Sequence, residues 1–267
     1  MKQRFNYEDY RKLSVLPFED KVCRAYELIQ TELKQSKKPL VSSSWGKDSI
    51  VLLHLVREFC KDVAICFHNT GVQYIETYQY RDFMLKEWDI KNYFETKPKI
   101  SFWECVRKYG YPRFRRMGRG KRGQKDNRGR DGAKSPRCCY HLKEKPAIDF
   151  IKQNNIDLEF VGLQASESMV RRLSFFREGE VFDSKKYGCR IVRPLMIWTD
   201  EDIWRYHKDF NIPINPIYKK MKRNGCMPCT GFKTWREVLA KTNPKTYAFI
   251  SKDMGQPLLS EYCGDNK

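Results

Sequence analysis

The stretch PLVSSSWGKDS, residues 39–49, decides the fold, because it joins a short apolar run to a loop of small and polar residues. After this loop, residues 50–59 show apolar side chains at helical spacing, so the order strand, loop, helix is predicted. A loop between a buried strand and a helix presents backbone N–H groups and the positive end of the helix dipole to an anion. The stretch therefore predicts an anion site inside an α/β fold.

The alternation of strand and helix continues beyond this stretch. Residues 63–68 form a short apolar run that suits a buried parallel strand, and residues 74–88 return to helical spacing. Further strands are expected at 93–96, 158–163 and 190–194, with a helix at 141–153. Strands that alternate with helices predict an α/β fold with a doubly wound, mainly parallel sheet, whose ligands bind at the carboxyl ends of the strands.

The chain divides by pattern into three successive parts. We expect a helical N-terminal segment over residues 1–36, a nucleotide-binding α/β domain over 37–205, and a helical and loop-like C-terminal region over 206–267. Periodicity stops inside the middle part, where we expect a basic insertion over 107–137. Residues 113–130 of this insertion hold nine basic residues and one acidic residue, and its glycines argue against a stable helix.

Composition excludes several classes of protein. The chain has 267 residues, of which 40% are hydrophobic, so a packed core is expected and wholesale disorder is excluded. A formal net charge of +19 predicts a polyanionic partner, whether nucleotide or nucleic acid. No apolar run of about 18 residues and no signal peptide is visible, so we expect a cytoplasmic protein without membrane contact. In that reducing compartment, ten cysteines favour metal or redox chemistry over disulfides.

The loop after the first strand carries the residues of the predicted phosphate site. Lys47 adds a mobile positive charge, and Asp48 is placed to orient a Mg²⁺ ion or that lysine. The loop lacks the Walker A spacing, and a turn with an N-capping serine is the alternative interpretation. The candidate phosphate ligands besides Lys47 are Ser43, Ser44, Gly46 and Ser49.

Residues 44–49, SWGKDS, resemble the SGGKDS pyrophosphate loop of the PP-loop ATP pyrophosphatases, with Trp45 in place of one glycine. The adenylyl-sulfate and phosphoadenylyl-sulfate reductase superfamily has the same loop in altered form. The resemblance continues to about Thr230 and includes a stretch at 194–204 that is similar to PL-x-x-W-T-x-x-D-I-W. It implies a fold like that of the adenine nucleotide α-hydrolases.

Two further motifs extend this resemblance to the nucleotide site. Residues 69–71, followed by Glu76 and Thr77, resemble the DTG-x-x-x-x-ET segment that lies beside the nucleotide in the superfamily. Gly162 with the pair at 171–172 resembles the glycine turn and the phosphate-binding arginines, although a solvated helix face is the alternative for the arginines. The resemblance thus implies that Asn69, Thr70, Gly71, Gly162, Arg171 and Arg172 contact the nucleotide.

Four of the cysteines lie in two pairs that are close in sequence, Cys138 with Cys139 and Cys226 with Cys229. Four thiolates from two loops can hold zinc or an iron–sulfur cluster, and an unmetallated set of buried thiols is the third alternative. The arrangement Cys-Cys-x-x-x-Lys-x-x-Pro with a later Gly-Cys-x-x-Cys-Thr resembles the 4Fe-4S signature of adenylyl-sulfate reductases. It implies a 4Fe-4S cluster on these four cysteines.

In the segment Glu-Tyr-Cys263-Gly, Cys263 resembles the nucleophile in the C-terminal Glu-Cys-Gly of sulfonucleotide reductases.

Two enzymatic mechanisms compete for this set of motifs. Many sulfonucleotide reductases lack Lys-Asp-Ser in the loop, and this chain keeps it at 47–49, which favours ATP with Mg²⁺ as ligand and Lys47 and Asp48 as catalytic residues. The basic insertion favours a nucleic acid as acceptor. Since no added RNA-binding domain is visible, DNA is favoured over tRNA.

The combination of the phosphate loop, the two cysteine pairs and the basic insertion resembles the sulfur-inserting ATP pyrophosphatases of DNA phosphorothioation and the cluster-dependent tRNA thiolases. The resemblance implies cleavage of ATP to AMP and pyrophosphate, and sulfur delivered by a persulfide donor such as a cysteine desulfurase. A homodimer is the assembly we expect. The alternatives are a sulfonucleotide reductase that produces sulfite and a nucleic-acid-binding module that is stabilised by zinc.

Overall fold

The computed structural model describes residues 5–112 and 137–255, and its contacts divide the chain into two compact units. We call them the sheet unit and the cysteine unit, and each is described by itself. The sheet unit comprises the described residues of Met1–His68, Glu76–Thr96 and Pro146–Pro216, and the cysteine unit those of Asn69–Ile75, Lys97–Lys145 and Ile217–Lys267. This division groups segments that are distant in sequence, so the three successive parts expected above stay a prediction.

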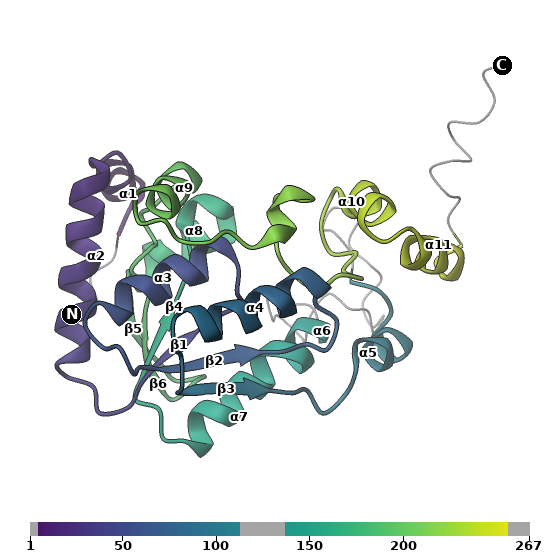
Figure 1. Cartoon of the computed structure of the whole chain (residues 1–267), viewed down its shortest axis with the longest axis horizontal. Coiled ribbons are helices and arrows are strands. Elements are labelled where there is room, and N and C mark those ends of the chain that lie inside the picture. The colour runs from purple at the N-terminus through teal and green to yellow at the C-terminus, as the bar shows by residue number, and fades with distance from the viewer. Residues whose placement is uncertain (1–4, 113–136, 256–267) are drawn as a thin grey trace. The chain divides into compact units, whose positions relative to one another are not determined.

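The sheet unit is built on one six-stranded sheet with the strand order β3-β2-β1-β4-β6-β5 (Figure 1). All neighbouring strands are parallel except β5 and β6, which are antiparallel. The chain therefore has the predicted doubly wound, mainly parallel α/β fold. The strands are β1 (Pro39–Ser42), β2 (Ala64–His68), β3 (Tyr93–Thr96), β4 (Leu158–Val161), β5 (Val181–Ser184) and β6 (Cys189–Val192).

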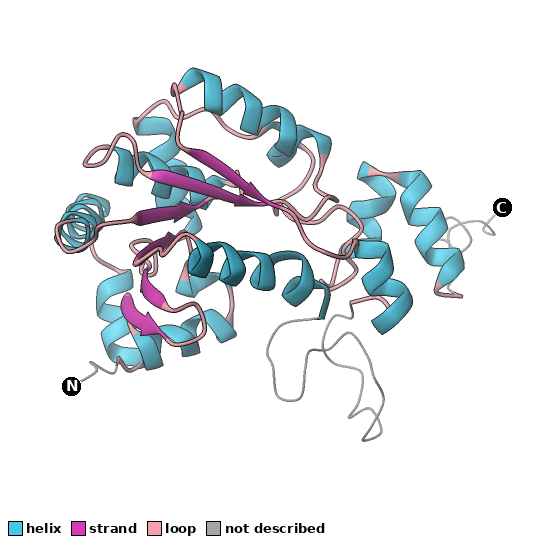
Figure 2. Ribbon diagram, turned by 90° about the horizontal axis from the view of Figure 1, so that it is seen from below, coloured by secondary structure: helices cyan, strands magenta, loops and turns pink. Residues whose placement is uncertain are grey.

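Helices cover both faces of this sheet (Figure 2). On one face, Val41 and Phe160 pack in the main core with residues of α2, α3 and α9. On the other face, Leu40 and Cys66 pack with Ile151 of α7. This alternation of neighbouring strand residues between the two buried faces explains why β1 and β2 are mostly apolar. The helices of the sheet unit are α1 (Tyr7–Ser14), α2 (Phe18–Leu33), α3 (Lys47–Arg57), α4 (Ile75–Glu87), α7 (Lys145–Gln153), α8 (Met169–Glu178) and α9 (Asp200–Asp209), with the 3₁₀ turn η2 (Ala165–Glu167) between β4 and α8. A second 3₁₀ turn, η3 (Pro216–Lys219), begins at the last residue of the sheet unit and continues into the cysteine unit.

The cysteine unit has a smaller core of its own. Phe102, Trp235, Leu239 and Ile250 are buried together there. Its helices are α5 (Phe102–Tyr109), α6 (Arg137–Cys139), α10 (Trp235–Thr242) and α11 (Pro244–Asp253), with the π-helical turn η1 (Tyr140–Glu144) following α6.

Most expected elements are present with ends shifted by a few residues, and the helix expected at 141–153 is divided into η1 and α7. Helix α3 begins at Lys47, before the first apolar residue of the pattern, because Gly46 acts as the N-cap and Ser49 closes the first turn. Strand β5 was not predicted, since its sequence VFDS is short and half polar. Across the described residues, no helix combines the length and the apolar character needed to cross a bilayer.

Candidate functional site: the phosphate loop and the paired thiols

The predicted phosphate loop connects β1 to α3 within the sheet unit. The N–H of Ser43 donates to the carbonyl oxygen of Cys66 at 3.0 Å, so the loop leaves the sheet only after this residue. The N–H groups of Ser44 and Gly46 both donate to Oγ of Ser49, at 3.2 and 3.1 Å. Ser49 Oγ donates in turn to the carbonyl oxygen of Gly46 at 3.0 Å. The hydroxyl of Ser49 therefore shapes the loop, since two of the loop N–H groups converge on its oxygen.

Trp45 occupies the position of a glycine in the SGGKDS pattern. Its φ of 58° lies in the left-handed region that glycine adopts without cost. Its side chain is fully buried in the main core, with the ring centroid 6.0 Å from that of Tyr93. The indole therefore contributes to the core and has no exposed surface for a ligand to contact.

Lys47 is held by two carboxylates. Its Nζ lies 2.7 Å from Oδ1 of Asp48 and 2.7 Å from Oδ1 of Asp200, the first residue of α9. Gln164, which is fully buried, donates from Nε2 to the same Oδ1 of Asp48 at 2.8 Å. The predicted pairing of Lys47 with Asp48 is thus observed, and the ammonium group is fixed at the amino end of α3, where an anion would bind.

Gly162 lies directly against this end of α3. A Cβ atom at residue 162 would lie 3.1 Å from the carbonyl oxygen of Asp48 and 3.2 Å from Cα of Ser49. Only a glycine allows the turn after β4 to approach the loop this closely. The structure thereby brings Gly162 together with the loop.

The two candidate arginines of α8 have other contacts in the structure. Arg171 forms an ion pair with Glu167 of η2. The guanidinium carbon of Arg172 lies 5.3 Å from the ring centroid of Tyr10, and within the described residues its buried Nε has no hydrogen-bond partner. These contacts are of the kind that arginines on a helix face make, which was the alternative interpretation. Phosphate binding by the two arginines stays a prediction.

The segment at 69–71 belongs to the cysteine unit. Oδ1 of Asn69 accepts from the N–H of Gly71 at 2.8 Å, and Gly71 has a φ of 75° that requires glycine. Sγ of Cys226 donates to Oγ1 of Thr70 at 3.4 Å. The segment also lines a cavity of about 410 Å³ together with Val72, Lys97, Pro98, Ser101, Phe102 and Trp103. The structure therefore connects this motif with one of the predicted ligand cysteines.

All four cysteines of the two pairs are free thiols within the cysteine unit. A hydrogen bond from Cys138 to Cys139 raises the pKa of Cys138 and lowers the pKa of Cys139 to about 7. Burial raises the pKa of Cys229 to about 11. Charge on Cys226, above all, raises the pKa of Lys143. The two pairs therefore lie close enough to influence each other's ionisation.

The chemistry of this donor set fits a soft metal centre. Thiolates are the ligands that zinc and iron–sulfur clusters accept, and a neighbouring lysine stabilises their charge. No group of three or more His, Cys, Asp or Glu side chains within residues 5–112 and 137–255 is arranged to hold a metal ion as it stands. A 4Fe-4S cluster on the four cysteines stays a prediction.

Two sequence predictions fall outside the described part of the chain. They are the nucleophile Cys263 and the basic residues at 113–130.

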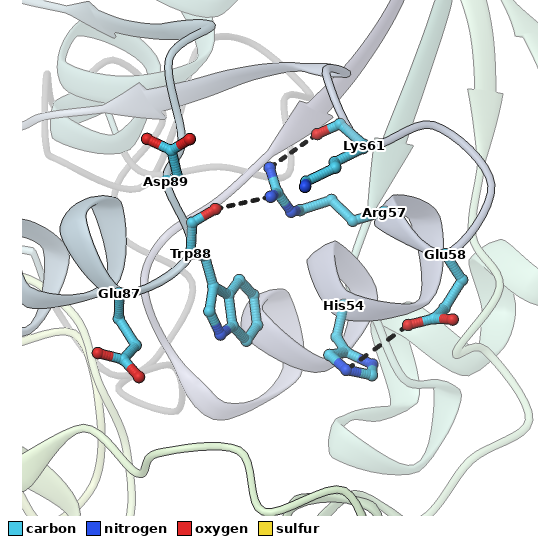
Figure 3. Close-up of a pocket in the computed structure, with 7 residues that line it drawn as sticks. All are labelled: His54, Arg57, Glu58, Lys61, Glu87, Trp88 and Asp89. Carbon is cyan, nitrogen blue, oxygen red and sulfur yellow. Dashed lines mark hydrogen bonds and ion pairs between the residues drawn. The ribbon is translucent and has the colours of Figure 1, made fainter.

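Another pocket lies at the opposite end of α3 from the phosphate loop (Figure 3). It has a volume of about 480 Å³. Arg57 donates to the carbonyl oxygens of Lys61 and Trp88, both at 2.8 Å, and His54 Nδ1 lies 2.9 Å from the hydroxyl of Tyr206. Arg57 thus bonds α3 to the two chain segments that precede β2 and β3. None of the residues that line this pocket belongs to the predicted site. The lining residues are His54, Arg57, Glu58, Lys61, Glu87, Trp88 and Asp89.

Sequence reasoning missed several partners of the loop. Asp200 and Gln164 bind Lys47 and Asp48, and His207 and Asn215 bind loop carbonyl oxygens. The only available signal was for Asp200, which lies in the stretch at 194–204 that is similar to PL-x-x-W-T-x-x-D-I-W. The other three give no periodic or compositional signal.

Comparison with known proteins adds an independent finding. The family model described as the phosphoadenosine phosphosulfate reductase domain matches residues 38–232. An adenosine 5'-phosphosulfate reductase from Staphylococcus epidermidis is 26% identical over 234 residues, which cover 85% of this chain and 86% of that protein. A phosphoadenosine 5'-phosphosulfate reductase from Xylella fastidiosa is 25% identical over 209 residues, which cover 78% and 76%.

A solved structure supports the fold. The crystal structure of a phosphoadenylyl-sulfate reductase from Candida auris has a TM-score of 0.55 and 15% sequence identity. The similarity covers 85% of this chain and 98% of that chain.

Proposed function

Because this chain belongs to the phosphoadenosine phosphosulfate reductase domain family, we propose that it is a sulfonucleotide reductase, with adenylyl sulfate or its 3'-phosphorylated form as substrate. The observation that carries this proposal is that one family model, over residues 38–232, includes both the phosphate loop and the two cysteine pairs. The named relatives support the same activity, since they cover most of this chain. Sulfonucleotide reduction was the alternative in the sequence analysis, and the comparisons favour it over sulfur insertion into DNA.

The proposed reaction has two steps. A cysteine thiolate attacks the sulfur atom of the sulfonucleotide, an S–S bond forms, and the S–O bond to the phosphate breaks, so AMP leaves with the electron pair. A dithiol protein of the thioredoxin class then attacks the cysteine sulfur of the enzyme-bound thiosulfonate, releases sulfite and becomes a disulfide. We assign the attacking thiolate to Cys263, on the resemblance of its segment to the C-terminal motif of these reductases.

Residues of the loop would hold the nucleotide during this reaction. Lys47 and the first N–H groups of α3 offer positive charge to the phosphate, and Asp48 fixes the position of Lys47. The four paired cysteines would hold a 4Fe-4S cluster, which supplies redox and electrostatic chemistry when bound. Lys143 would stabilise the negative charge of their thiolates.

The experiment that tests this proposal uses the full chain purified without oxygen. Adenylyl sulfate with reduced thioredoxin should yield sulfite and AMP, and Cys263→Ser should abolish sulfite formation. Cys23→Ser is the matched control, because Cys23 is an exposed free thiol outside both pairs. A protein that forms no sulfite from either sulfonucleotide would contradict the proposal.

A second candidate function is favoured by the geometry of Lys47. An ammonium group fixed between Asp48 and Asp200 at the loop suits the stabilisation of a departing pyrophosphate. In this candidate, an oxygen of a nucleic acid, DNA more than tRNA, attacks the α-phosphorus of Mg-ATP and pyrophosphate leaves. The outer sulfur of a persulfide, from a donor such as a cysteine desulfurase, then bonds to the adenylylated phosphorus and AMP departs. A dithiol reductant cleaves the S–S bond of this adduct and becomes a disulfide, so that the sulfur stays on the nucleic acid and the donor leaves as a thiol. A homodimer is the assembly expected for this enzyme. Release of pyrophosphate that requires both Mg-ATP and DNA would favour this candidate over the reductase.

A further inference from the structure

Two buried side chains that lie far from the phosphate loop in sequence bind its backbone. Nε2 of His207, in α9, lies 3.0 Å from the carbonyl oxygen of Lys47. Nδ2 of Asn215 donates to the carbonyl oxygen of Trp45 at 2.9 Å. Each of the two side chains is only 2% exposed. We call His207 and Asn215 the carbonyl clamp.

The carbonyl clamp holds two peptide units of the loop, the one that joins Trp45 to Gly46 and the one that joins Lys47 to Asp48. A peptide unit is planar and trans, so the N–H of a residue points away from the carbonyl oxygen of the residue before it. With the Lys47 carbonyl turned toward His207, the N–H of Asp48 is directed to the opposite side. That N–H lies in the first turn of α3, where the amides have no acceptor within the helix and can bind an anion.

Asn215 acts on the most strained residue of the loop. The φ of 58° at Trp45 is costly for a residue with a side chain, and such a conformation persists only where the surroundings impose it. The buried indole of Trp45 and the hydrogen bond from Asn215 supply two such constraints. Without the amide of Asn215, the peptide between Trp45 and Gly46 would lose one of them.

His207 also has a contact that a purely structural role would explain. Its Nδ1 lies 3.3 Å from the carbonyl oxygen of Ile212, at the end of α9. A neutral imidazole has one N–H group, and burial lowers the pKa of His207, so the neutral ring donates to only one of the two oxygens. The shorter distance, 3.0 Å against 3.3 Å, favours the Lys47 carbonyl as the acceptor.

From these contacts we propose that His207 and Asn215 are positioning residues, which hold the peptide units at Trp45 and Lys47 so that the N–H of Asp48 and the ammonium group of Lys47 face the phosphate of the ligand. The proposal rests on the proposed function, because it takes this loop as the site for the phosphate of a nucleotide. Neither residue needs to contact the ligand.

The test compares two probes, inorganic pyrophosphate and adenosine, by calorimetric titration of the full chain. In His207→Leu and Asn215→Asp, we expect the affinity for pyrophosphate to fall roughly tenfold, because a donor to a loop carbonyl is lost. The affinity for adenosine, which has no phosphate, should change less than about twofold. His207→Gln should keep most of the pyrophosphate affinity, since its amide N–H can donate in place of Nε2.

His54→Gln is the control, because His54 lies near the other end of α3 and contacts Tyr206 instead of the loop. Unchanged pyrophosphate affinity in folded Asn215→Asp, or an equal loss of affinity for both probes, would overturn the proposal. If His207→Leu does not fold, amide hydrogen exchange of Asp48 in His207→Gln and Asn215→Asp replaces it. Faster exchange in Asn215→Asp alone is expected, and equal exchange in both would overturn the proposal. Wild-type protein that binds neither probe would contradict the proposed function itself.

Discussion

The phosphate loop and the paired thiols differ in how far the chain itself completes them. In the loop, hydroxyl, carboxylate and amide groups of the sheet unit already bond to one another, from Ser49 at the centre to Asp48 and Lys47 at its edge. In the thiol group, opposite pKa shifts of Cys138 and Cys139 leave one thiol poised to ionise and its neighbour protonated. The comparison teaches that side chains of the chain already hold the loop in place through hydrogen bonds and ion pairs, whereas the two cysteine pairs are linked mainly through the effect of one thiol on the ionisation of another.

The largest effect is expected from removal of a predicted cluster ligand. Cys226→Ser in protein purified without oxygen should lose nearly all bound iron and acid-labile sulfide, because a three-thiolate site holds a 4Fe-4S cluster poorly. Cys23→Ser serves as the control thiol. Analysis of iron and acid-labile sulfide measures the result. Wild-type protein that contains zinc and no sulfide would contradict the cluster and would favour a structural zinc ion on these cysteines.

Removal of the loop lysine should be the next largest effect. Lys47→Ala should lower turnover of adenylyl sulfate about 100-fold or more, since a fixed cation at a phosphate is worth this much. Lys34→Ala, an exposed lysine after α2, is the matched control. Steady-state kinetics measures the effect, and a Lys47→Ala enzyme with wild-type turnover would show that the preorganised loop is no substrate site.

A pH dependence is expected from Glu159, a buried residue of β4. Its Oε1 accepts from Oγ of Ser42 at 2.5 Å, and burial raises the pKa of Glu159 from 4.5 to about 7. The folded state therefore prefers the protonated carboxyl, and this contribution to stability is complete below pH 4.5 and is lost as pH rises through 7.

Glu159→Gln should remove this loss. Relative to wild type, the free energy of unfolding of the variant should rise by about 3 kcal/mol between pH 4.5 and pH 8. Urea unfolding at several pH values measures the difference. A difference that does not depend on pH would mean that Glu159 does not titrate in this range and that the sheet next to the loop is less constrained than the structure indicates.

The smallest of the effects is expected at Gly162. Gly162→Ala places a methyl group against the backbone of Asp48 and Ser49, which should cost about 1–2 kcal/mol of stability and weaken pyrophosphate binding severalfold. Gly225→Ala is the control, because nothing lies within 4 Å of a Cβ there. If calorimetry gave equal pyrophosphate affinities for both variants, the close approach of β4 to the loop would have no role in ligand binding.

Sequence patterns predicted the parts of the fold that depend on neighbouring residues. The strand, loop and helix over residues 39–57 follow from apolar spacing and small residues, and the mainly parallel sheet follows from the alternation of strands with helices, whereas the order of the strands was not predicted. The pairing of Lys47 with Asp48 was one of the two predicted roles of Asp48, and it is the one that the structure shows. Strand β5 was missed, since it pairs only with β6 and half of its side chains are polar.

The missing parts of the site depend on contacts across the fold. Gln164 and Asp200 are 116 and 153 residues from their partners in the loop, and Asn215 is 170 residues from Trp45. Single polar residues at such distances have no periodicity, so their contacts follow only from the packing of α9 and the turn after β4 against α3. The cysteine pairs were recognised because their spacing is itself a pattern.

The most direct test of the account is a side-by-side assay of the anaerobically purified chain with two substrates. One arm contains adenylyl sulfate with reduced thioredoxin, and the other contains Mg-ATP with DNA. The account predicts sulfite and AMP in the first arm and no pyrophosphate in the second. Pyrophosphate from ATP together with no sulfite from adenylyl sulfate would contradict it.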